Sequence, residues 1–554
     1  MLLAGLLPMV ALIACPAPPT AGEGEGEGEG EGEGEGEGEG EGEGEPIVEP
    51  DDPGPADVRL AVRIDTQRHP ISGLIYGWNG SDHSDVDRPT VVRSGGNRLT
   101  AYNWENNASN AGSDYCFQND GMMGGPGSPP AHAFAALLDD ALERGSAALI
   151  TVPIVDVVAA DHDDLGDGGQ GPPACVGDVQ HSGADFLQTR FVPNHEAKGA
   201  AFADPPDLSD GAVYQDEAVA LVRSHWPDVP LLVSLDNEPD LWSETHARIH
   251  PDPVSYAELV DRTIRFASAV KDVDEDVTVL GFVSYGYNGY LTLQNAPDAA
   301  AHGEFIPYFL DALRAEELAQ GRRIVDVLDL HWYPEARGDG VRISSAQDGT
   351  GAAARVQAPR SLWDPAYRED SWIANDVVGG PITLLPTLFS HIDAHDAGIR
   401  VSFTEWNYGG GEDISGAIAV TDVLGVFGRE GVFAATLFPL AGDEPFNRAG
   451  LRVYTSYDDA GAGFGATSVS AVSNDVERVT VYASDDPLVV VAVNKSGATI
   501  DAGLTLAAPA ITHLRRFVLD GGVPAIAEGT GVDAVGRNAF HVALPASSVT
   551  VLVR

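Results

Sequence analysis

Two glutamates occur in settings where a pair of carboxyl groups could do chemistry. Glu238 lies in the stretch SLDNEPDLW (234–242) and Glu405 in FTEWNY (403–408), each shortly after an apolar run. Glycoside hydrolysis needs one carboxyl group to protonate the leaving oxygen and a second to attack the sugar or to activate water. A single glutamate in such a place is more often a surface residue or an ion-pair partner. Two of them, both beside aromatic residues, favour the catalytic interpretation.

The elements around these glutamates predict a parallel α/β fold. Short runs rich in Val, Ile and Leu alternate with stretches whose apolar residues have helical spacing. The predicted strands are 71–78, 90–93, 147–155, 231–235, 277–283, 325–330, 399–403 and 432–438. The predicted helices are 132–144, 215–223, 256–270, 305–319 and 414–427. We therefore expect an eight-stranded β/α (TIM) barrel over residues 70–455, with both glutamates at the C-terminal ends of strands, where barrel enzymes place their catalytic groups.

The last hundred residues have a different pattern. Alternating apolar runs at 479–482, 488–494, 502–506, 515–519 and 549–553 are separated by turn residues, which predicts a C-terminal antiparallel β-sandwich domain. Residues 57–69 also alternate, and we assign them with 456–554 to this domain. The domain contains no Trp and only two tyrosines, Tyr457 and Tyr482. Structural support for the barrel is therefore a better interpretation than a separate binding module.

Three polar side chains near predicted strand ends, Arg93, His331 and Tyr333, are assigned to substrate binding, and two of them are also candidates to support Glu405. Tyr333, in HWYP (331–334) after the sixth predicted strand, could donate a hydrogen bond to Glu405 and keep it ionised. Arg93, at the end of the second predicted strand, could support Glu405 in the same way. A core role for His331 and Tyr333, and a structural ion pair for Arg93, are the alternatives.

Aromatic residues gather after the predicted C-terminal strand ends. Flat rings stack on the C–H faces of pyranose rings, so this placement favours a polysaccharide substrate. We assign substrate binding to Trp78, Trp104, Trp242, Trp332, Trp406 and Tyr408, and expect two or three of the strand-end tryptophans to be core residues. The long connections at 94–130, 156–209 and 331–380 predict the walls of an open cleft, which favours cleavage within a chain.

The charge of the chain excludes some partners. The 554 residues carry a formal net charge of −52, from 84 acidic and 32 basic residues. This charge repels phosphate backbones, so we expect no nucleic-acid partner and a neutral substrate. No apolar run reaches the roughly 20 residues that a membrane-spanning helix needs. We expect a monomer whose only membrane attachment is through a lipid.

The N-terminal residues predict export. The apolar stretch 2–14 ends in LIAC (12–15), which resembles the lipobox of bacterial lipoproteins and predicts cleavage before Cys15 and lipidation of that residue. The basic residues that usually begin such a signal are missing, and an ordinary secretory signal is the alternative. Residues 16–56 hold twelve Gly-Glu repeats and a Pro-rich segment, which predicts a flexible linker. We expect an anchored lipoprotein at the bacterial cell surface or periplasm, or a secreted protein.

The remaining cysteines and one acidic cluster are further candidate sites. With Cys15 lipidated, Cys116 and Cys175 form an even pair in an oxidising compartment, and a disulfide between them is plausible. An acidic loop could hold a structural calcium ion, although a solvated loop is the simpler interpretation; its residues are Asp161, Asp163, Asp164 and Asp167. The two-carboxylate chemistry requires no cofactor.

Several separated stretches resemble glycoside hydrolase family 44, a clan A family of retaining endo-glucanases and xyloglucanases. They are RSGGN (93–97), YNW (102–104), DGAVYQDE (210–217), NEPDLW (237–242), TEWNYGG (404–410), ISGAIA (414–419) and DVLG (422–425). Their order holds from about residue 57 to the C-terminus. The resemblance implies a barrel joined to a β-sandwich, with Glu238 as general acid/base, Glu405 as nucleophile and Asn237 as a hydrogen-bond partner of the sugar 2-hydroxyl. Asp236 and Ser94 depart from the family pattern and could alter the subsite next to the scissile bond.

The sequence thus predicts a retaining endo-β-1,4-glucanase that acts on xyloglucan or cellulose-type glucans. One alternative is a clan A β-glycanase on another polymer, mannan or xylan, with the same carboxylates and different subsites. A second is a catalytically inactive carbohydrate-binding surface lipoprotein, against which the presence of both glutamates argues.

Overall fold

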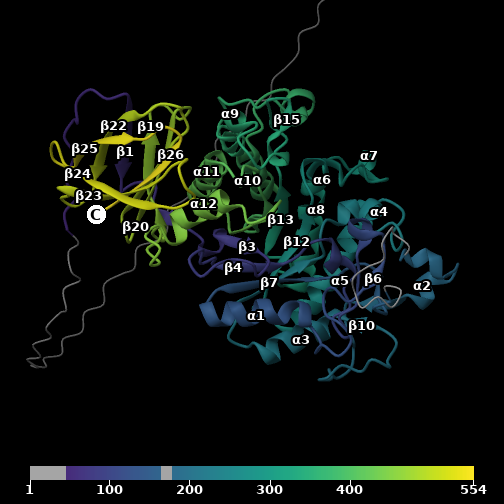
Figure 1. Ribbon diagram of the computed structural model, residues 1–554. Helices are drawn as coiled ribbons and strands as arrows, with labels where there is room; N and C mark the ends of the chain where they lie inside the picture. The colour runs from purple at the N-terminus through teal and green to yellow at the C-terminus, as the bar shows by residue number, and fades with distance from the viewer. Residues whose placement is uncertain (1–44, 164–176) are drawn as a thin grey trace, which may run out of the picture. The chain divides into compact units, whose positions relative to one another are not determined.

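The computed structural model describes residues 45–163 and 177–554 (Figure 1). Among these residues, no helix combines the length and the apolar character needed to cross a membrane.

Eight parallel strands close into a barrel, which confirms the predicted fold class. In order around the barrel they are β11 (Leu231–Leu235), β12 (Thr278–Ser284), β13 (Val327–Trp332), β16 (Arg400–Trp406), β17 (Ala434–Leu437), β3 (Gly77–Asn79), β4 (Val91–Ser94) and β7 (Ala147–Val152). Every predicted strand contributes one of them. The first is shorter than predicted, because a 3-10 turn, η1 (Gly73–Ile75), takes up the residues before Gly77.

The larger helices connect the barrel strands, and five of them match predictions within three residues at either end. These are α1 (His132–Arg144), α3 (Gln215–His225), α5 (Tyr256–Val273), α8 (Phe305–Gln320) and α11 (Ile414–Glu430). Helices α10 (Leu384–His395) and α12 (Pro445–Thr455) were not predicted. Each has a proline in its first turn, Pro386 and Pro445, where the missing N–H has no helical partner to lose.

Two sheets form the C-terminal sandwich. One has the order β19 (Ser470–Ser473), β1 (Val58–Arg63), β22 (Ile500–Ala507) and β25 (Ala539–Leu544). The other has the order β2 (His69–Pro70), β18 (Thr467–Ser468), β20 (Val479–Asp485), β21 (Val489–Asn494), β26 (Ser548–Val553), β23 (His513–Leu519) and β24 (Ala527–Asp533). The N-terminal β1 runs parallel to β22, so the first sheet is mixed rather than purely antiparallel. Strand β24 was missed because its sequence, AEGTGVD, has few apolar residues and is mostly exposed.

The long connections carry short elements. After β7 come β8 (Val157–Ala159), α2 (Phe186–Thr189), β9 (Phe191–His195) and β10 (Val213–Tyr214); β5 (Ser109–Asn110) and β6 (Asn119–Asp120) lie in the connection after β4. After β11 comes α4 (Trp242–Thr245); α6 (Tyr287–Thr292) and α7 (Ala299–His302) follow β12; β14 (Arg337–Gly338), β15 (Val341–Arg342) and α9 (Ala352–Arg355) follow β13.

Helix α11 joins the barrel to the sandwich. It contacts β20, β21 and β26 of the larger sheet. Gly425 permits this approach, since a Cβ there would lie 2.4 Å from the ring of Tyr482. In the same interface, Asp422 of α11 forms a fully buried ion pair with Lys495, at 2.9 Å.

Candidate active site

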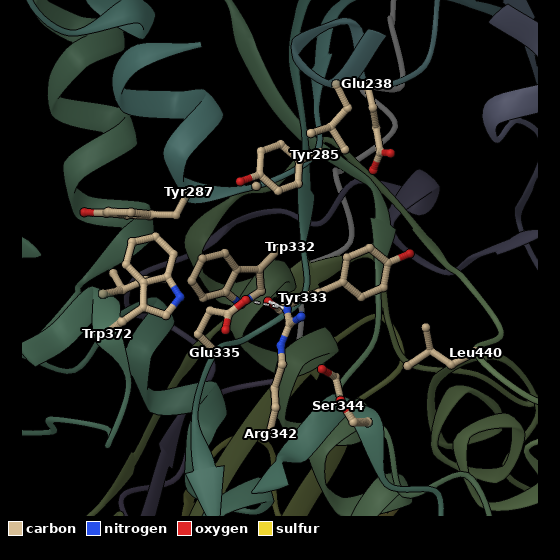
Figure 2. A pocket seen from close by; sticks show the side chains of 14 residues that line it. Glu238, Tyr285, Tyr287, Trp332, Tyr333, Glu335, Arg342, Ser344, Trp372 and Leu440 are labelled. Carbon is tan, nitrogen blue, oxygen red and sulfur yellow. Dashed lines mark hydrogen bonds and ion pairs between the residues drawn. The ribbon is translucent and has the colours of Figure 1, made fainter. Parts of the chain in front are cut away.

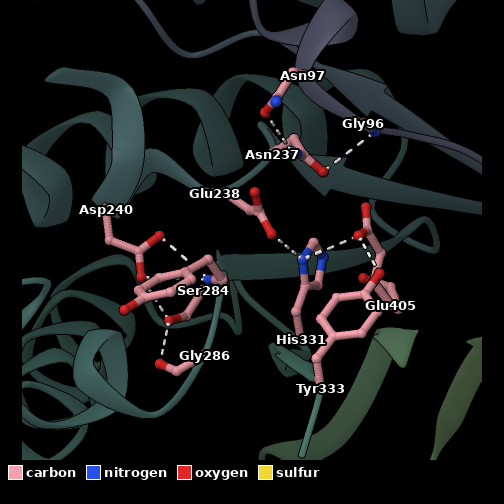
Figure 3. A network of polar contacts seen from close by, with 12 residues as sticks. Gly96, Asn97, Asn237, Glu238, Asp240, Ser284, Gly286, His331, Tyr333 and Glu405 are labelled. Carbon is pink, nitrogen blue, oxygen red and sulfur yellow. Dashed lines mark hydrogen bonds and ion pairs between the residues drawn. The ribbon is translucent and has the colours of Figure 1, made fainter. Parts of the chain in front are cut away.

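Three titratable side chains from different strands meet at the C-terminal end of the barrel. Glu238 follows β11, His331 lies in β13 and Glu405 lies in β16. The His331 Nδ1 atom is 2.8 Å from Glu238 Oε1 and 3.6 Å from Glu405 Oε2, so the imidazole stands between the two carboxyl groups (Figure 3). One ligand atom from each residue lies within 4.8 Å of the others. Retaining glycosidases hold their two carboxyl groups roughly 5 Å apart, and an upper limit of 4.8 Å between one oxygen of each glutamate fits that class better than the wider spacing of inverting enzymes.

Glu405 is held as a carboxylate. Arg93 Nη1 donates to its Oε1 at 2.7 Å, and the Tyr333 hydroxyl donates to its Oε2 at 2.8 Å. Burial raises the pKa of Glu405, but the positive charges of His331 and Arg93 and the two hydrogen bonds outweigh burial, so the pKa is lowered. Both contacts that the sequence predicts for Glu405 are present, and the group is prepared to act as a nucleophile.

Arg93 also orients Asn237. Its Nη2 donates to the Asn237 side-chain oxygen at 2.8 Å, and the Gly96 amide donates to the same oxygen at 3.2 Å. The Asn237 amide nitrogen is thereby turned the other way, where one N–H donates to Asn97 Oδ1 at 3.4 Å and a second N–H is left for another acceptor. Gly95 makes room for the guanidinium, because a Cβ at this position would lie 2.1 Å from Arg93 Cζ.

The position of His331 between the two carboxyl groups was not predicted from the sequence. Burial lowers its pKa, but Glu405 and Glu238 more than reverse this, so the net shift is upward and the cationic form is favoured. The Tyr290 hydroxyl donates to the His331 carbonyl oxygen and fixes the backbone there. From its sequence position, His331 was expected to be a substrate contact or a core residue. Its position between both carboxyl groups depends on the parallel pairing of β13 with β16, which no local pattern encodes.

A cavity of about 390 Å³ opens beside Glu238. Figure 2 shows Glu238 at one end and Tyr287 with Trp372 at the other. The lining also includes Tyr285, Trp332, Tyr333, Glu335 and Arg342, and the remaining lining residues are Leu241, Gly286, Ser344, Ser345, Ile373 and Leu440. Aromatic walls with a few polar groups suit a sugar chain. Tyr285, Tyr287, Glu335, Arg342 and Trp372 were not assigned to the site from sequence, although each follows the end of β12 or β13.

Arg342 connects the cavity wall to the backbone that carries Tyr333. Its Nη2 donates to the Tyr333 carbonyl oxygen at 2.6 Å and pairs with Glu335 at 2.9 Å, and its Nε donates to the Pro334 carbonyl at 3.0 Å. The backbone that carries Tyr333 is therefore fixed on the side away from Glu405.

Four of the tryptophans assigned to substrate binding lie in the core instead. Trp78, Trp104, Trp242 and Trp406 are each at most 1 % exposed, and none lines the cavity. Three of their indoles donate internally, Trp78 to Asp82, Trp104 to the Tyr214 carbonyl and Trp242 to Asp236. The prediction that these four rings stack on the substrate is wrong, because packed helices and loops cover their faces.

Tyr408 and Trp332 form a buried pair. Tyr408 is fully buried and accepts a hydrogen bond from the Trp332 indole at 3.0 Å, so the assignment of Tyr408 to substrate binding is also wrong. Trp332 is 1 % exposed, but it does line the cavity.

The two departures from the family pattern lie away from the cavity. Asp236 is fully buried; its carboxylate accepts from the Thr100 hydroxyl, the Asn237 and Ile154 amides and the Trp242 indole. Ser94 ends β4, and its carbonyl accepts from the Thr151 hydroxyl. Neither residue lines the cavity.

The disulfide and calcium predictions fall partly outside the described residues. Cys116 is disulfide-bonded, while Cys15 and Cys175 both lie outside the described residues. Asp164 and Asp167 lie outside them as well. The Asp161 carboxylate accepts two hydrogen bonds from Arg190, at 2.9 Å each, and the Asp163 amide donates to it at 2.9 Å. The calcium site and the pairing of Cys116 with Cys175 stay predictions.

In the part of the chain that the structure describes, Glu238, His331 and Glu405 form the one group of three acidic or histidine ligands close enough to hold a metal ion. Arg93 and Tyr333 already donate to both Glu405 oxygens. A guanidinium beside the carboxylate disfavours a second cation there, so the donor set suits acid–base and nucleophilic chemistry better than metal binding.

Known proteins resemble this chain over most of its length. A family model described as glycoside hydrolase family 44 matches residues 108–336. Endoglucanase A from Paenibacillus lautus is 36% identical over 523 residues, which cover 90% of this chain and 72% of that protein. A beta-mannanase/endoglucanase A from Caldicellulosiruptor saccharolyticus is 32% identical over 88% of this chain, a match that covers 38% of that protein.

Solved structures give the same relationship. A Paenibacillus polymyxa xyloglucanase from family 44, determined with xyloglucan, has a TM-score of 0.83 and 36% identity, covering 90% of this chain and 99% of that chain. A family 44 endoglucanase from Clostridium thermocellum has a TM-score of 0.82 and 35% identity, covering 90% of this chain and 100% of that chain.

Proposed function

The chain belongs to glycoside hydrolase family 44, and from this premise we propose that it is a retaining endo-β-1,4-glucanase acting on xyloglucan or cellulose-type glucans. One observation carries the proposal. Two carboxyl groups lie within 4.8 Å at the C-terminal end of the barrel, and Arg93 and Tyr333 keep one of them ionised.

The geometry supports a double displacement. Glu405 attacks the anomeric carbon while Glu238, protonated, gives its proton to the departing glycosidic oxygen, which leaves a glycosyl ester on Glu405. Glu238 then takes a proton from water, whose oxygen attacks the anomeric carbon and releases Glu405. Two inversions retain the configuration of the sugar.

His331 balances charge during this cycle. Its imidazole lies beside both carboxyl groups, so its positive form stabilises Glu405 before attack and Glu238 after proton transfer. Asn237, whose amide nitrogen is oriented by Arg93, donates to the sugar 2-hydroxyl, an interaction that strengthens in the transition state.

The cavity adjoins Glu238, and Glu405 is not among its lining residues. Because Glu238 protonates the leaving group, the leaving end of the glucan occupies this cavity, against Tyr285, Tyr287 and Trp372.

The first experiment compares polymers. Reducing-end release and viscosity loss are measured on xyloglucan, carboxymethylcellulose, mannan and xylan with wild type, Glu238→Gln and Glu405→Gln. Rapid viscosity loss on a β-1,4-glucan, abolished by either substitution, supports the proposal. Activity confined to mannan or xylan would overturn the substrate and keep the mechanism, and binding without cleavage would point to a capture protein.

We also propose that the protein is exported and anchored through lipidated Cys15. The lipobox-like LIAC segment supports this, as does the disulfide at Cys116, since disulfides persist in oxidising compartments. Labelling with a radioactive fatty acid tests it. Label in wild type and none in Cys15→Ser is expected, whereas an unlabelled wild type contradicts the anchor.

A further inference from the structure

A buried carboxylate that the mechanism does not use lies two residues after Glu238. Asp240 is in the 3-10 turn η5 (Pro239–Leu241) and is 4 % exposed. Its Oδ2 accepts the Ser284 hydroxyl at 2.7 Å, and both its oxygens lie 3.3 Å from the Tyr285 amide nitrogen (Figure 3). The carboxylate therefore joins the turn after Glu238 to the end of strand β12.

A backbone hydrogen bond also connects the turn after β11 to strand β12. The Glu238 amide donates to the Val283 carbonyl at 3.0 Å, so the loop that carries Glu238 is tied to β12 by its backbone as well as by Asp240. Tyr285 then continues from β12 into the cavity wall, where its hydroxyl donates to Gln294 at 2.7 Å. Asp240 thus bonds to the residues that place one wall of the cavity beside Glu238.

A neighbouring helix packs closely against the Asp240 carboxyl group. Helix α6 approaches at Gly289, where a Cβ would lie 2.0 Å from Asp240 Oδ2 and 2.1 Å from Ser284 Oγ. The charged groups that face Asp240 are Glu238 and His331, and the neighbouring tyrosines are Tyr285 and Tyr290. No lysine or arginine within the described ranges pairs with Asp240, so no salt bridge compensates for the cost of burying it.

We propose that Asp240 is a positioning residue for proton transfer from Glu238. Through its hydrogen bonds with Ser284 and the Tyr285 amide, it holds the cavity wall at Tyr285, where the leaving group binds, at the correct distance from the Glu238 carboxyl group. This inference rests on the proposed function, because it takes Glu238 as the acid that protonates the leaving group. A glycosidic oxygen held slightly too far from Glu238 loses general acid catalysis, while attack by Glu405 is unaffected.

Substrates with different leaving groups separate this role from a purely structural one. A 2,4-dinitrophenyl cellotrioside departs without protonation, whereas a glucan polymer needs the acid. The measured quantity is kcat/KM, which covers steps up to departure of the leaving group. For Asp240→Ala we expect a loss of about 30-fold on the polymer, part of the roughly 10²–10⁴-fold worth of general acid catalysis. We expect less than a threefold loss on the aryl glycoside.

Three further variants sharpen the test. Asp240→Asn keeps an oxygen acceptor and is expected to restore polymer activity to within about fivefold of wild type. Ser284→Ala removes the same bond from the other side, so its loss should not add to that of Asp240→Ala. The control is Glu369→Gln: Glu369 is a buried carboxylate that accepts the Ser361 hydroxyl at 2.6 Å and does not line the cavity. It should show no difference between the substrates.

The outcomes are distinct. Equal losses on both substrates, no loss on either, or failure of Asp240→Asn to recover would each overturn the positioning role. Circular dichroism and thermal unfolding establish that each variant is folded. If wild type cleaves no glucan polymer, the proposed function itself fails, whereas a normal wild type with an unselective Asp240→Ala overturns this inference alone.

Discussion

Two buried pairs of a cation and a carboxylate lie in different regions of the molecule. Arg93 and Glu405 are 2.7 Å apart at the C-terminal end of the barrel, and Lys495 and Asp422 are 2.9 Å apart where α11 meets the sandwich. By burial alone they are nearly alike, with side-chain exposures of 0 and 7 % in the first pair and 0 % for both residues in the second.

Their surroundings differ. Asp422 accepts the Thr480 hydroxyl at 2.5 Å, the Tyr482 hydroxyl at 2.7 Å and the Lys495 ammonium, and none of these residues lines the cavity beside Glu238. Glu405 shares the imidazole of His331 with a second carboxyl group that borders an open cavity. A buried ion pair alone therefore does not mark a functional site. A functional site is indicated instead by a carboxylate that lies beside a proton donor and next to a cavity large enough for a substrate.

The largest expected effect comes from removing the nucleophile. Glu405→Gln keeps the shape of the side chain but cannot form the ester, so kcat should fall by about 10⁴-fold or more, measured by reducing-end release. Asp422→Asn, the matching change in the other pair, should keep kcat per folded molecule. Comparable losses in the two variants would remove the distinction between the regions.

Breaking the second pair should act on stability instead. Lys495→Met leaves the Asp422 carboxylate buried without its cation, which should lower the free energy of unfolding by about 3–5 kcal/mol in urea titrations. The kcat of the folded fraction should not change. The double variant Lys495→Met/Asp422→Leu removes both charges and should recover most of the loss; a double variant as unstable as the single one would contradict this account.

A smaller effect is expected at Tyr333. Tyr333→Phe removes a hydrogen bond to a charged group, worth about 1.5–3 kcal/mol, which is about 10–100-fold in kcat/KM. The donor favours the ionised form of Glu405, so its loss raises the pKa of that carboxyl and moves the acidic limb of the pH–rate profile to higher pH. Tyr408→Phe changes a buried hydroxyl that does not contact Glu405 and serves as the control. An unmoved limb in Tyr333→Phe would count against the assignment.

The last prediction concerns the pH dependence of stability near the C-terminal end of the barrel. Burial raises the pKa of Asp240 from 3.8 to about 7, with Glu238 adding to the rise and Ser284 opposing it. Between these values the folded protein holds a proton that the unfolded chain releases, so this stabilisation is lost as pH rises from about 4 through 7. Its contribution is at most about 1.4 kcal/mol per pH unit. Denaturant unfolding of Asp240→Asn at several pH values should show a flatter dependence than wild type; parallel curves would contradict it.

The barrel and the two glutamates were predictable because their signals are local. A strand of alternating or continuous apolar residues is recognisable by itself, and the residue after it must lie at the C-terminal end of a parallel sheet. Once the strands were identified, Glu238 and Glu405 were therefore expected at the same end of the barrel. Strand β24 lacked such a signal because its residues are mostly polar and exposed. Helices α10 and α12 do have buried apolar residues at helical spacing, but each has a proline in its first turn, which interrupts the pattern where the helix begins.

By itself the sequence determined the order of the barrel strands, the family and the two glutamates at the C-terminal end of the barrel, because each depends on residue type and spacing along the chain. Tertiary structure alone decided which aromatic residues line the cavity beside Glu238. Trp406 is the last residue of β16 and Tyr333 follows β13, yet the Trp406 ring is buried under α11 beside Phe427 and Tyr333 borders the cavity. It also decided that His331 stands between Glu238 and Glu405. Both outcomes depend on which neighbouring segments cover a side chain, and those neighbours are distant in the sequence.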